Sequence, residues 1–346
     1  MAPHKIEPDL IKKAKGEPYQ TRLLESIQSG RTLYQKTQDL KALDREPSQE
    51  DVKTAVEEIT ARLTATRDTL ASDPSTIQST VEVYRQTTDE RQWPSVIVDI
   101  LAAEQLEAVS SRLAQAGFSL VSDDIDTGRQ SWQKYAPLRF LHVRIPPEMA
   151  FIDYLADQPF TDFVFDAEKI VTLPDPVIGR MDKGPALEMS EARDLILPAH
   201  DWPADAPASL GQDVNIAIVD SGIDSRHPDF MGKIKAIQNF TEEPDAEDTN
   251  GHGSHVAGIA AGRGAASHGR YQGISPESGL IIAKVFDASG SAQTSKILSA
   301  MQWAYEQRAQ VMNLSLGNSM TPTDGQSLLS RACDRLAELG MGVCVS

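Results

Sequence analysis

The sequence has few cysteines and few basic residues, and each shortage excludes a class of protein. Its 346 residues include two cysteines, Cys333 and Cys344, which excludes a disulfide framework. We expect the first on a helix and the second in a buried strand, both as free core thiols. Lysine and arginine number 33 against 50 acidic residues, a net charge of −17. Because binding to phosphates needs clustered basic side chains, we expect no nucleic-acid partner.

Long apolar runs are also missing. No stretch of about eighteen apolar residues is present, as a membrane-spanning helix would need, so we expect no membrane partner. The N-terminal residues contain no apolar core of a secretory signal. This absence predicts a cytoplasmic location, with secretion by another route left open.

The remaining composition is that of a soluble globular protein, with 40% hydrophobic and 24% charged residues. The length predicts two or three domains. Residues 1–92 predict a helical N-terminal extension, because Ser48 and Asp51 have the spacing of a capping box and an apolar stripe at helical spacing follows them. No chemistry is indicated in this extension, which favours a leader or spacer over a targeting or regulatory arm.

Three further segments follow in the sequence. Residues 93–173 have a pattern of strand, helix, strand, strand, helix, strand, which predicts an α+β, ferredoxin-like unit. One of its strands alternates apolar residues with His142, which we therefore expect at the surface. Residues 174–212 are rich in proline, alanine and acidic residues and predict a linker. In residues 213–346 strands alternate with helices, which predicts an α/β domain with a parallel sheet.

Two side chains in the last segment have the character of a catalytic pair. Asp220 ends the apolar strand VNIAIVD, and α/β sheets place their sites at the carboxyl ends of parallel strands. His252 lies in the first turn of the helix-like stretch GHGSHVAGIAAG. An aspartate that holds an imidazole tautomer and a histidine that accepts a proton are two thirds of a nucleophilic triad. We expect the two side chains to lie within about 3 Å of each other.

These residues also carry a family resemblance. The motifs VDSGID, HPDF and GHGSHVAG resemble the Asp and His motifs of the subtilisin-like serine proteases, in which Asp, His and Ser follow in that order. The resemblance implies a three-layer parallel-sheet fold for residues 213–346, a polypeptide substrate, and Asp220 and His252 as the catalytic pair of a serine endopeptidase. It also implies that residues 93–173 are a propeptide that assists folding and inhibits the active site, and that the chain is cut within 174–212.

The same resemblance implies where a substrate would lie. The segment VMNLSLGN resembles the strand that lines the specificity pocket, so an extended peptide beside it would bond to Ser315 and Gly317, with Leu316 between them. The loop FDASGSAQ resembles the opposite wall of the cleft and places Gly290 near the substrate backbone.

We expect no metal or other cofactor. His252 and His255 are three residues apart, as in some zinc sites, but no third ligand motif accompanies them. His255 is therefore expected to be a buried structural residue. Asp229 occupies a calcium-ligand position in many relatives, but one carboxylate cannot supply the roughly six to eight oxygens of a calcium site. Calcium binding stays open as the less favoured alternative.

The sequence departs from the family at the nucleophile. It contains no G-T-S-M-A-like serine motif and no A-A-G-N-like turn for an oxyanion-hole asparagine. In subtilisin itself, removing the serine lowers kcat by on the order of 10⁶, so we expect this chain alone to be inactive. The favoured interpretation is the N-terminal part of a protease. An inactive interaction or inhibitor protein (a pseudoprotease) and one half of a split protease are the alternatives.

Overall fold

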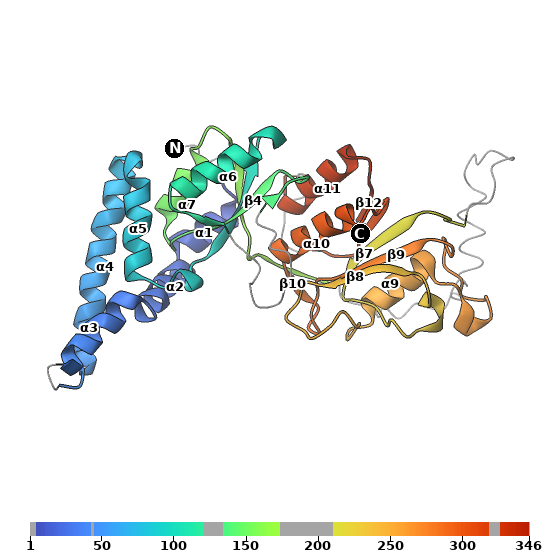
Figure 1. The fold of residues 1–346 in the computed structure, drawn as a ribbon, viewed down its shortest axis with the longest axis horizontal. Helices are drawn as coiled ribbons and strands as arrows, with labels where there is room; N and C mark the ends of the chain where they lie inside the picture. Colours follow the sequence, from blue (N-terminus) through green and yellow to red (C-terminus); the bar gives the residue numbers. More distant parts are fainter. Residues whose placement is uncertain (1–4, 43–44, 121–133, 174–209, 318–325, 346) are drawn as a thin grey trace, which may run out of the picture. The chain divides into compact units, whose positions relative to one another are not determined.

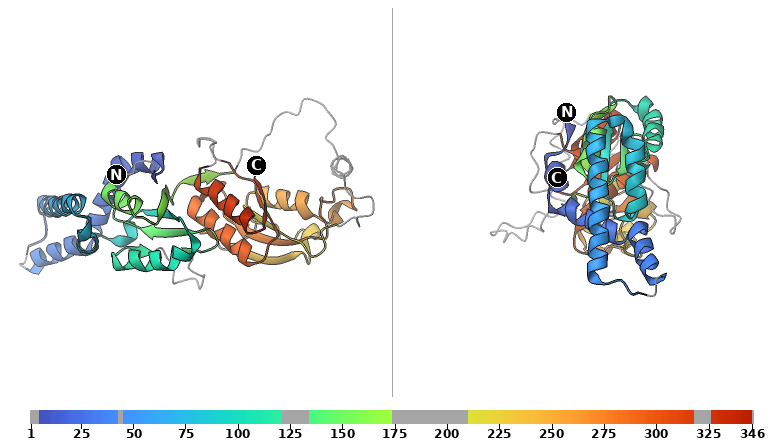
Figure 2. Two further views of the ribbon diagram at one scale, coloured as in Figure 1. Left: turned by 90° about the horizontal axis from the view of Figure 1, so that it is seen from above. Right: turned by 90° about the vertical axis from the view of Figure 1, so that its left-hand side faces the viewer.

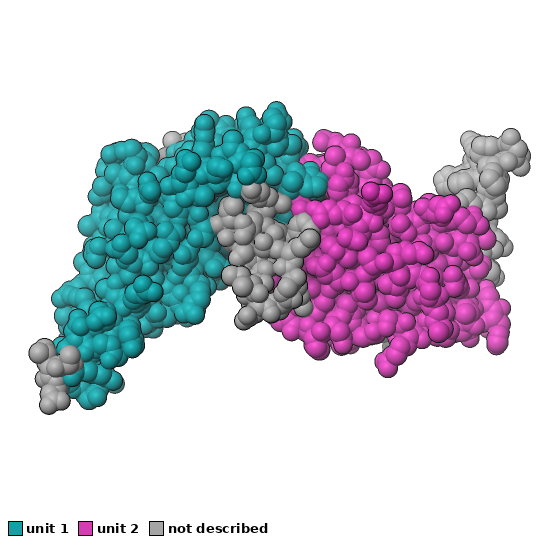
Figure 3. Space-filling view, viewed as in Figure 1, with its two compact units in different colours: residues 1–168 teal, residues 169–346 magenta. Residues whose placement is uncertain are grey.

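A computed structural model describes residues 5–42, 45–120, 134–173, 210–317 and 326–345. The chain divides into two compact units, Met1–Glu168 and Lys169–Ser346, which Figure 3 colours separately. Apart from its last three positions, the predicted linker 174–212 lies outside the described residues. No described helix combines the length and the apolar character that crossing a membrane requires.

The first unit begins with helices (Figure 1). They are α1 (Pro8–Lys15), α2 (Glu17–Gln28), α3 (Arg31–Ala42), α4 (Gln49–Ser72) and α5 (Ile77–Thr87). The capping box predicted for α4 is confirmed, because Ser48 Oγ accepts from the Asp51 amide and the Asp51 carboxylate accepts from the Ser48 amide. On the predicted apolar stripe of α4, Ile59 and Leu63 are buried.

An antiparallel sheet with two helices completes the first unit. Its elements are β1 (Ser95–Ile100), α6 (Leu106–Gln115), β2 (Ser119–Leu120), β3 (Lys134–Tyr135), β4 (Phe140–Arg144), α7 (Met149–Ala156) and β5 (Thr161–Asp166). The strand order is β2-β4-β1-β5, with β3 also paired to β4. Apart from the short additional strand β3, the chain therefore follows the βαββαβ order of a split βαβ unit.

Residues on both sides of position 92 share one hydrophobic core in this unit. Leu63 and Tyr84 from the helices belong to the same buried cluster as Val143 and Phe151. The prediction that His142 lies at the surface is wrong: its residue is only 6% exposed, and its Nε2 lies 2.9 Å from Ser95 Oγ. The His142 ring stacks on the buried Tyr135, with ring centroids 6.5 Å apart, and lies beside the buried Ile97, its partner on β1.

The second unit is built on a parallel sheet. Its strands are β7 (Asn215–Asp220), β8 (Ile234–Asn239), β9 (Gly279–Lys284), β11 (Val311–Leu314) and β12 (Gly342–Val345), in the order β12-β11-β7-β9-β8. The predicted parallel sheet is confirmed, although the sequence pattern did not indicate β8, a partly exposed edge strand. Figures 1 and 2 show helix α9 (His252–Ala261) on one face, and α10 (Thr294–Glu306) and α11 (Leu328–Glu338) on the other.

This three-layer arrangement explains the apolar strand sequences. Ile218 of β7 and Ile282 of β9 pack in one cluster with Ala257 of α9. Their neighbours Ala217 and Ala283 are also buried. Strands covered on both faces read as continuous apolar runs, which is why the pattern of β7 and β9 was readable from the sequence.

The two cysteines are free, but one of them is not in the core. Cys333 on α11 is half-buried, whereas Cys344 on β12 is exposed. The prediction of two buried thiols is therefore wrong for Cys344. Its strand is the last in the sheet order and, among the described residues, pairs only with β11.

The exposure difference predicts a difference in thiol reactivity. Burial, together with the nearby Asp334, raises the pKa of the Cys333 thiol to about 11. At pH 8 roughly one Cys333 in a thousand would then be a thiolate, the reactive form. We expect iodoacetamide to alkylate Cys344 first, and the Cys344→Ser variant to react slowly. Equal labelling rates at the two positions, followed by mass spectrometry, would contradict this.

Candidate active site

The predicted pair meets at the carboxyl end of β7. Asp220 is the last residue of this inner strand and is fully buried. His252 is the first residue of α9, and its side chain is 22% exposed. The His252 Nδ1 atom lies 2.8 Å from Asp220 Oδ1, which is hydrogen-bonding distance.

The environment of Asp220 suits a carboxylate that orients a base. Its Oδ1 also accepts from the Ser221 amide at 2.7 Å, whereas its Oδ2 is buried with no hydrogen-bond partner in the described part of the chain. Burial raises the pKa of the Asp220 carboxyl, against the effect of the bonds from His252 and Ser221. A carboxylate at Nδ1 holds the proton there and leaves Nε2 as the basic nitrogen of His252.

The start of α9 approaches the end of β7 very closely. A Cβ atom placed on Gly253 would lie 2.3 Å from the Gly222 carbonyl oxygen and 3.2 Å from the Ser221 amide nitrogen. Glycine at position 253 therefore lets the two backbones touch. This contact brings the His252 ring beside Asp220.

A buried lysine beneath the pair was not identified from the sequence. Lys284 Nζ donates to the Ser221 carbonyl (2.7 Å) and the Glu247 carbonyl (2.9 Å), and it pairs with the Glu243 carboxylate at 3.1 Å. Its side chain is fully buried. The available signal was a single charged residue inside the apolar run LIIAKVF, since a buried charge needs partners. Asp248, which bonds to Ser221, was also missed.

A short antiparallel strand pair forms a second feature of this unit. Strand β6 (Ile170–Thr172) pairs with β10 (Ser291–Gln293). The Leu173 amide donates to the Gly290 carbonyl at 2.9 Å, and the Gly317 amide donates to the Thr172 carbonyl at 3.4 Å. Two of the predicted substrate-binding residues, Gly290 and Gly317, thus both bond to one extended segment of the chain.

The other two predicted substrate-binding residues have different surroundings. Leu316 is 6% exposed, so its side chain lies in the core. The Ser315 hydroxyl accepts from the Asn313 side-chain amide at 2.8 Å. Position 317 ends this described stretch, and residues 318–325 lie outside the described residues.

The two residues singled out as metal-ligand alternatives, His255 and Asp229, have different surroundings. The prediction that His255 is buried is wrong: it is exposed, because it lies on the outer face of α9. Asp229 is buried, and its Oδ1 accepts from the Ala266 amide at 2.9 Å, so it holds a neighbouring turn. Among the described residues, no three histidine, cysteine or acidic side chains lie together as a metal-binding group.

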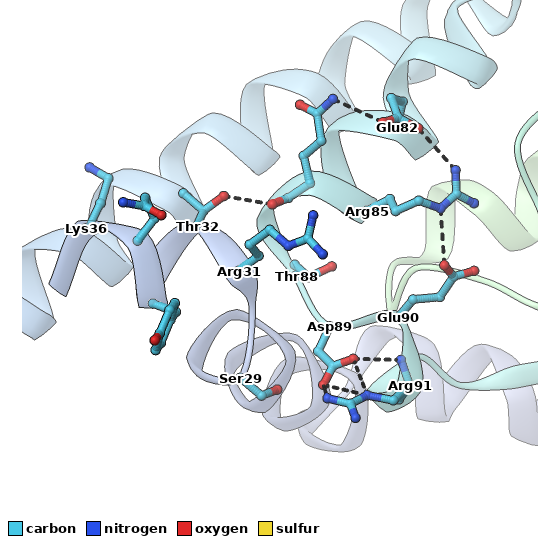
Figure 4. Close-up of a pocket in the computed structure, with 13 residues that line it drawn as sticks. Ser29, Arg31, Thr32, Lys36, Glu82, Arg85, Thr88, Asp89, Glu90 and Arg91 are labelled. Atoms are coloured by element: carbon cyan, nitrogen blue, oxygen red, sulfur yellow. Dashed lines mark hydrogen bonds and ion pairs between the residues drawn. The ribbon is translucent and has the colours of Figure 1, made fainter. Parts of the chain in front are cut away.

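The first unit has a hollow of about 1000 Å³ beside α3 and α5 (Figure 4). Most of its charged side chains are paired with one another. Arg85 lies between Glu82 and Glu90, and Arg91 pairs with Asp89 (Figure 4). These ion pairs account for five of the charged side chains that line the hollow.

Comparison with known proteins bears on the second unit. A family model described as "Subtilase family" matches residues 211–345. The "Major intracellular serine protease" of Bacillus subtilis (strain 168) is 34% identical over 136 residues, which is 38% of this chain and 41% of that protein. "Serine protease AprX" of the same strain is 31% identical over 171 residues, covering 46% of this chain and 37% of the relative.

Two further proteins give similar matches. "Subtilisin-like protease 6" of Trichophyton tonsurans is 35% identical over 132 residues, with 35% of this chain and 30% of that protein covered. A solved "cold adapted subtilisin-like serine proteinase" shares 29% identity over 39% of this chain and 45% of its own, with a TM-score of 0.32. This chain spans less than half the length of each of these relatives. Residues 211–345 thus match the subtilase family, and the relatives named here carry the names of subtilisin-like and serine proteases.

Proposed function

We propose that the second unit carries the acid and the base of a serine endopeptidase. The observation that carries this proposal is the 2.8 Å contact between His252 Nδ1 and Asp220 Oδ1 at the edge of a parallel sheet. In this role Asp220 fixes the imidazole tautomer. His252 Nε2 takes the proton of a serine hydroxyl as its oxygen attacks the peptide carbonyl carbon, and then gives the proton to the leaving amine.

The serine itself must come from a segment that this sequence does not contain, because no G-T-S-M-A-like motif occurs in it. The sequence likewise contains no A-A-G-N-like turn to supply the oxyanion-hole asparagine. We therefore expect the 346-residue chain alone to be inactive, and we propose neither metal, nucleic acid nor membrane as a partner. Cytoplasmic location stays a prediction.

We further propose that the substrate binds as an added strand between Gly290 and Gly317. Support comes from the segment Ile170–Thr172, which already lies in this manner, with backbone bonds to both glycines through Thr172 and Leu173. This segment ends the predicted propeptide, residues 93–173. Its position fits an intramolecular inhibitor, because a strand that occupies the place between Gly290 and Gly317 prevents a substrate strand from binding there.

The inhibitory role predicts a response to one substitution in the segment. Val171 is 3% exposed and faces Ala292 across the strand pair. In the Val171→Asp variant the segment should leave the cleft, because burying an unpaired charge is costly. We expect amide exchange at Leu173 to accelerate at least about tenfold, as the bond to Gly290 opens. Ile170→Asp, at a residue that is 52% exposed, is the control; equal protection in both variants would contradict the proposal.

The reading frame beyond Ser346 tests the enzymatic proposal. We expect it to continue into a serine motif, and its longer product to react with a fluorophosphonate at that serine, since only an activated serine reacts readily. A stop codon directly after Ser346 would contradict the proposal and favour an inactive interaction or inhibitor protein. A serine-bearing product that fails to react would also contradict it.

A further inference from the structure

The helix that carries His252 has no cap of its own. Its N-cap residue is Gly251, which has no side chain to bond the free amides of the first turn. Three side chains from outside the helix accept these amides instead. Asn250 Oδ1 accepts from His252 (3.3 Å), Ser221 Oγ from Gly253 (2.9 Å), and Asp248 Oδ2 from Ser254 (2.8 Å).

Of these three side chains, Asp248 makes the most hydrogen bonds. Its Oδ2 accepts from both the amide and the hydroxyl of Ser254, at 2.8 and 2.7 Å. Its Oδ1 accepts from the amides of Asn250 and Gly251, at 3.1 and 2.8 Å. Negative charge at a helix N-terminus is also favoured by the helix dipole. One carboxylate thus bonds both to Ser254 in the first turn of α9 and to the two residues that directly precede the helix.

The same carboxylate reaches the strand that carries Asp220. Asp248 Oδ1 accepts from Ser221 Oγ at 2.8 Å, and Ser221 directly follows Asp220 and is fully buried. Ser221 Oγ in turn accepts from the Gly253 amide, next to His252. The chain of bonds therefore joins the end of β7 to the start of α9 on both sides of the Asp220–His252 contact.

The charge on Asp248 is maintained by these bonds. Partial burial acts to raise the pKa of its carboxyl, but the hydrogen bonds from Ser254, Gly251 and Ser221 outweigh burial and lower the pKa. The carboxylate form accepts from five donors, which a neutral amide of the same shape cannot do. An asparagine at this position would turn an NH₂ group toward one set of donors.

We propose that Asp248 is a positioning residue for the catalytic pair: by bridging Ser221 and the first turn of α9, it sets the distance between Asp220 and His252. This inference deepens the proposed function and rests on it. A helix cap alone would stabilise α9 wherever the helix lay. The bridge to Ser221 adds a specific alignment, and its loss loosens the bond between His252 Nδ1 and Asp220 even while the helix stays folded.

The test follows the proton shared by His252 and Asp220 in the 346-residue chain, labelled with ¹⁵N-histidine. Its NMR resonance is assigned by its loss in His252→Gln. In Asp248→Asn we expect exchange of this proton with water to be roughly ten- to hundredfold faster, the effect of losing a charged hydrogen bond. Asp245→Asn is the matched control: the same change in the same loop, at an exposed residue that accepts from the Glu247 amide.

Two milder variants separate alignment from capping. Ser221→Ala removes the strand side of the bridge, and Ser254→Ala removes one donor on the helix side. The proposal predicts that Ser221→Ala and Asp248→Asn accelerate exchange by amounts that do not add in the double variant, because both break one bridge. Additive effects would mean two independent contacts and would overturn it. If Asp248→Asn does not fold, Ser221→Ala decides alone: faster exchange supports the proposal and unchanged exchange overturns it.

The outcomes also separate this inference from the proposed function. A shared-proton resonance that is present in the natural chain but unchanged in Asp248→Asn overturns the positioning role and leaves the catalytic pair in place. If the natural chain has no such resonance, the pair itself is contradicted, and the positioning role fails with it.

Discussion

Replacing Gly253 by alanine is expected to separate His252 from Asp220. The added Cβ would lie 2.3 Å from the Gly222 carbonyl oxygen, which is a backbone atom and cannot turn aside as the end of a flexible side chain could. Helix α9 must therefore move away from β7. We expect unit 2 to lose about 2 kcal/mol of stability, in the range for overpacked sites. Hydrogen exchange of the β7 and α9 peptides, read by mass spectrometry, measures this loss.

The control for this substitution lies on the same helix. A Cβ at Gly258 would meet no atom within 4 Å. Gly258→Ala should therefore stabilise α9 by about 0.5–1 kcal/mol, through better helix propensity and a less flexible unfolded chain. If Gly253→Ala were as well tolerated as Gly258→Ala, the close approach of α9 to β7 would be wrong.

Replacing Glu243 by alanine is expected to have the second large effect. It removes the carboxylate that pairs with the fully buried ammonium of Lys284 and leaves this ammonium bonded to two backbone carbonyls. Breaking a buried ion pair from one side costs about 3–5 kcal/mol, and we expect the lower end because the Glu243 side chain is 23% exposed. The loss should extend to the loop that contains Ala288, since Glu243 also accepts from the Ala288 amide.

The neighbouring acid provides the control for Glu243. The side chain of Glu242 is 95% exposed and lies 3.9 Å from Lys296. Such a surface pair contributes little, so Glu242→Ala should change the unfolding free energy of unit 2 by less than about 0.5 kcal/mol. Equal effects of the two substitutions, measured by hydrogen exchange at β9, would show that Lys284 does not depend on Glu243.

The parts of this protein that could be predicted from sequence are those with a repeating physical pattern. Strands β7 and β9 are buried on both faces, and their sequences are continuous apolar runs. The capping-box spacing of Ser48 and Asp51 predicted the start of α4. Asp220 and His252 could be paired from the sequence because Asp220 ends a strand and His252 begins a helix. Topology then brings the two ends to one sheet edge.

The parts that could not be predicted depend on contacts between distant segments. Nothing local to Asp248 indicates that it bonds to Ser221, 27 positions earlier. His142 alternates with apolar residues as a surface side chain would, yet its ring stacks on the buried Tyr135. The exposure of His255 and Cys344 likewise follows from which face or edge their elements occupy. Burial and long-range hydrogen bonds of this kind are determined by how the folded elements pack, and residue spacing along the chain does not indicate them.

The role of His252 as the catalytic base is tested most directly by the rate of peptide hydrolysis by the serine-bearing product after removal of the imidazole at position 252. For His252→Ala we expect a fall in kcat on the order of 10⁶, the size known for subtilisin itself. His255→Ala, three residues later on the same helix and exposed, should leave the rate unchanged. Undiminished cleavage by His252→Ala would contradict the role of His252 as the catalytic base.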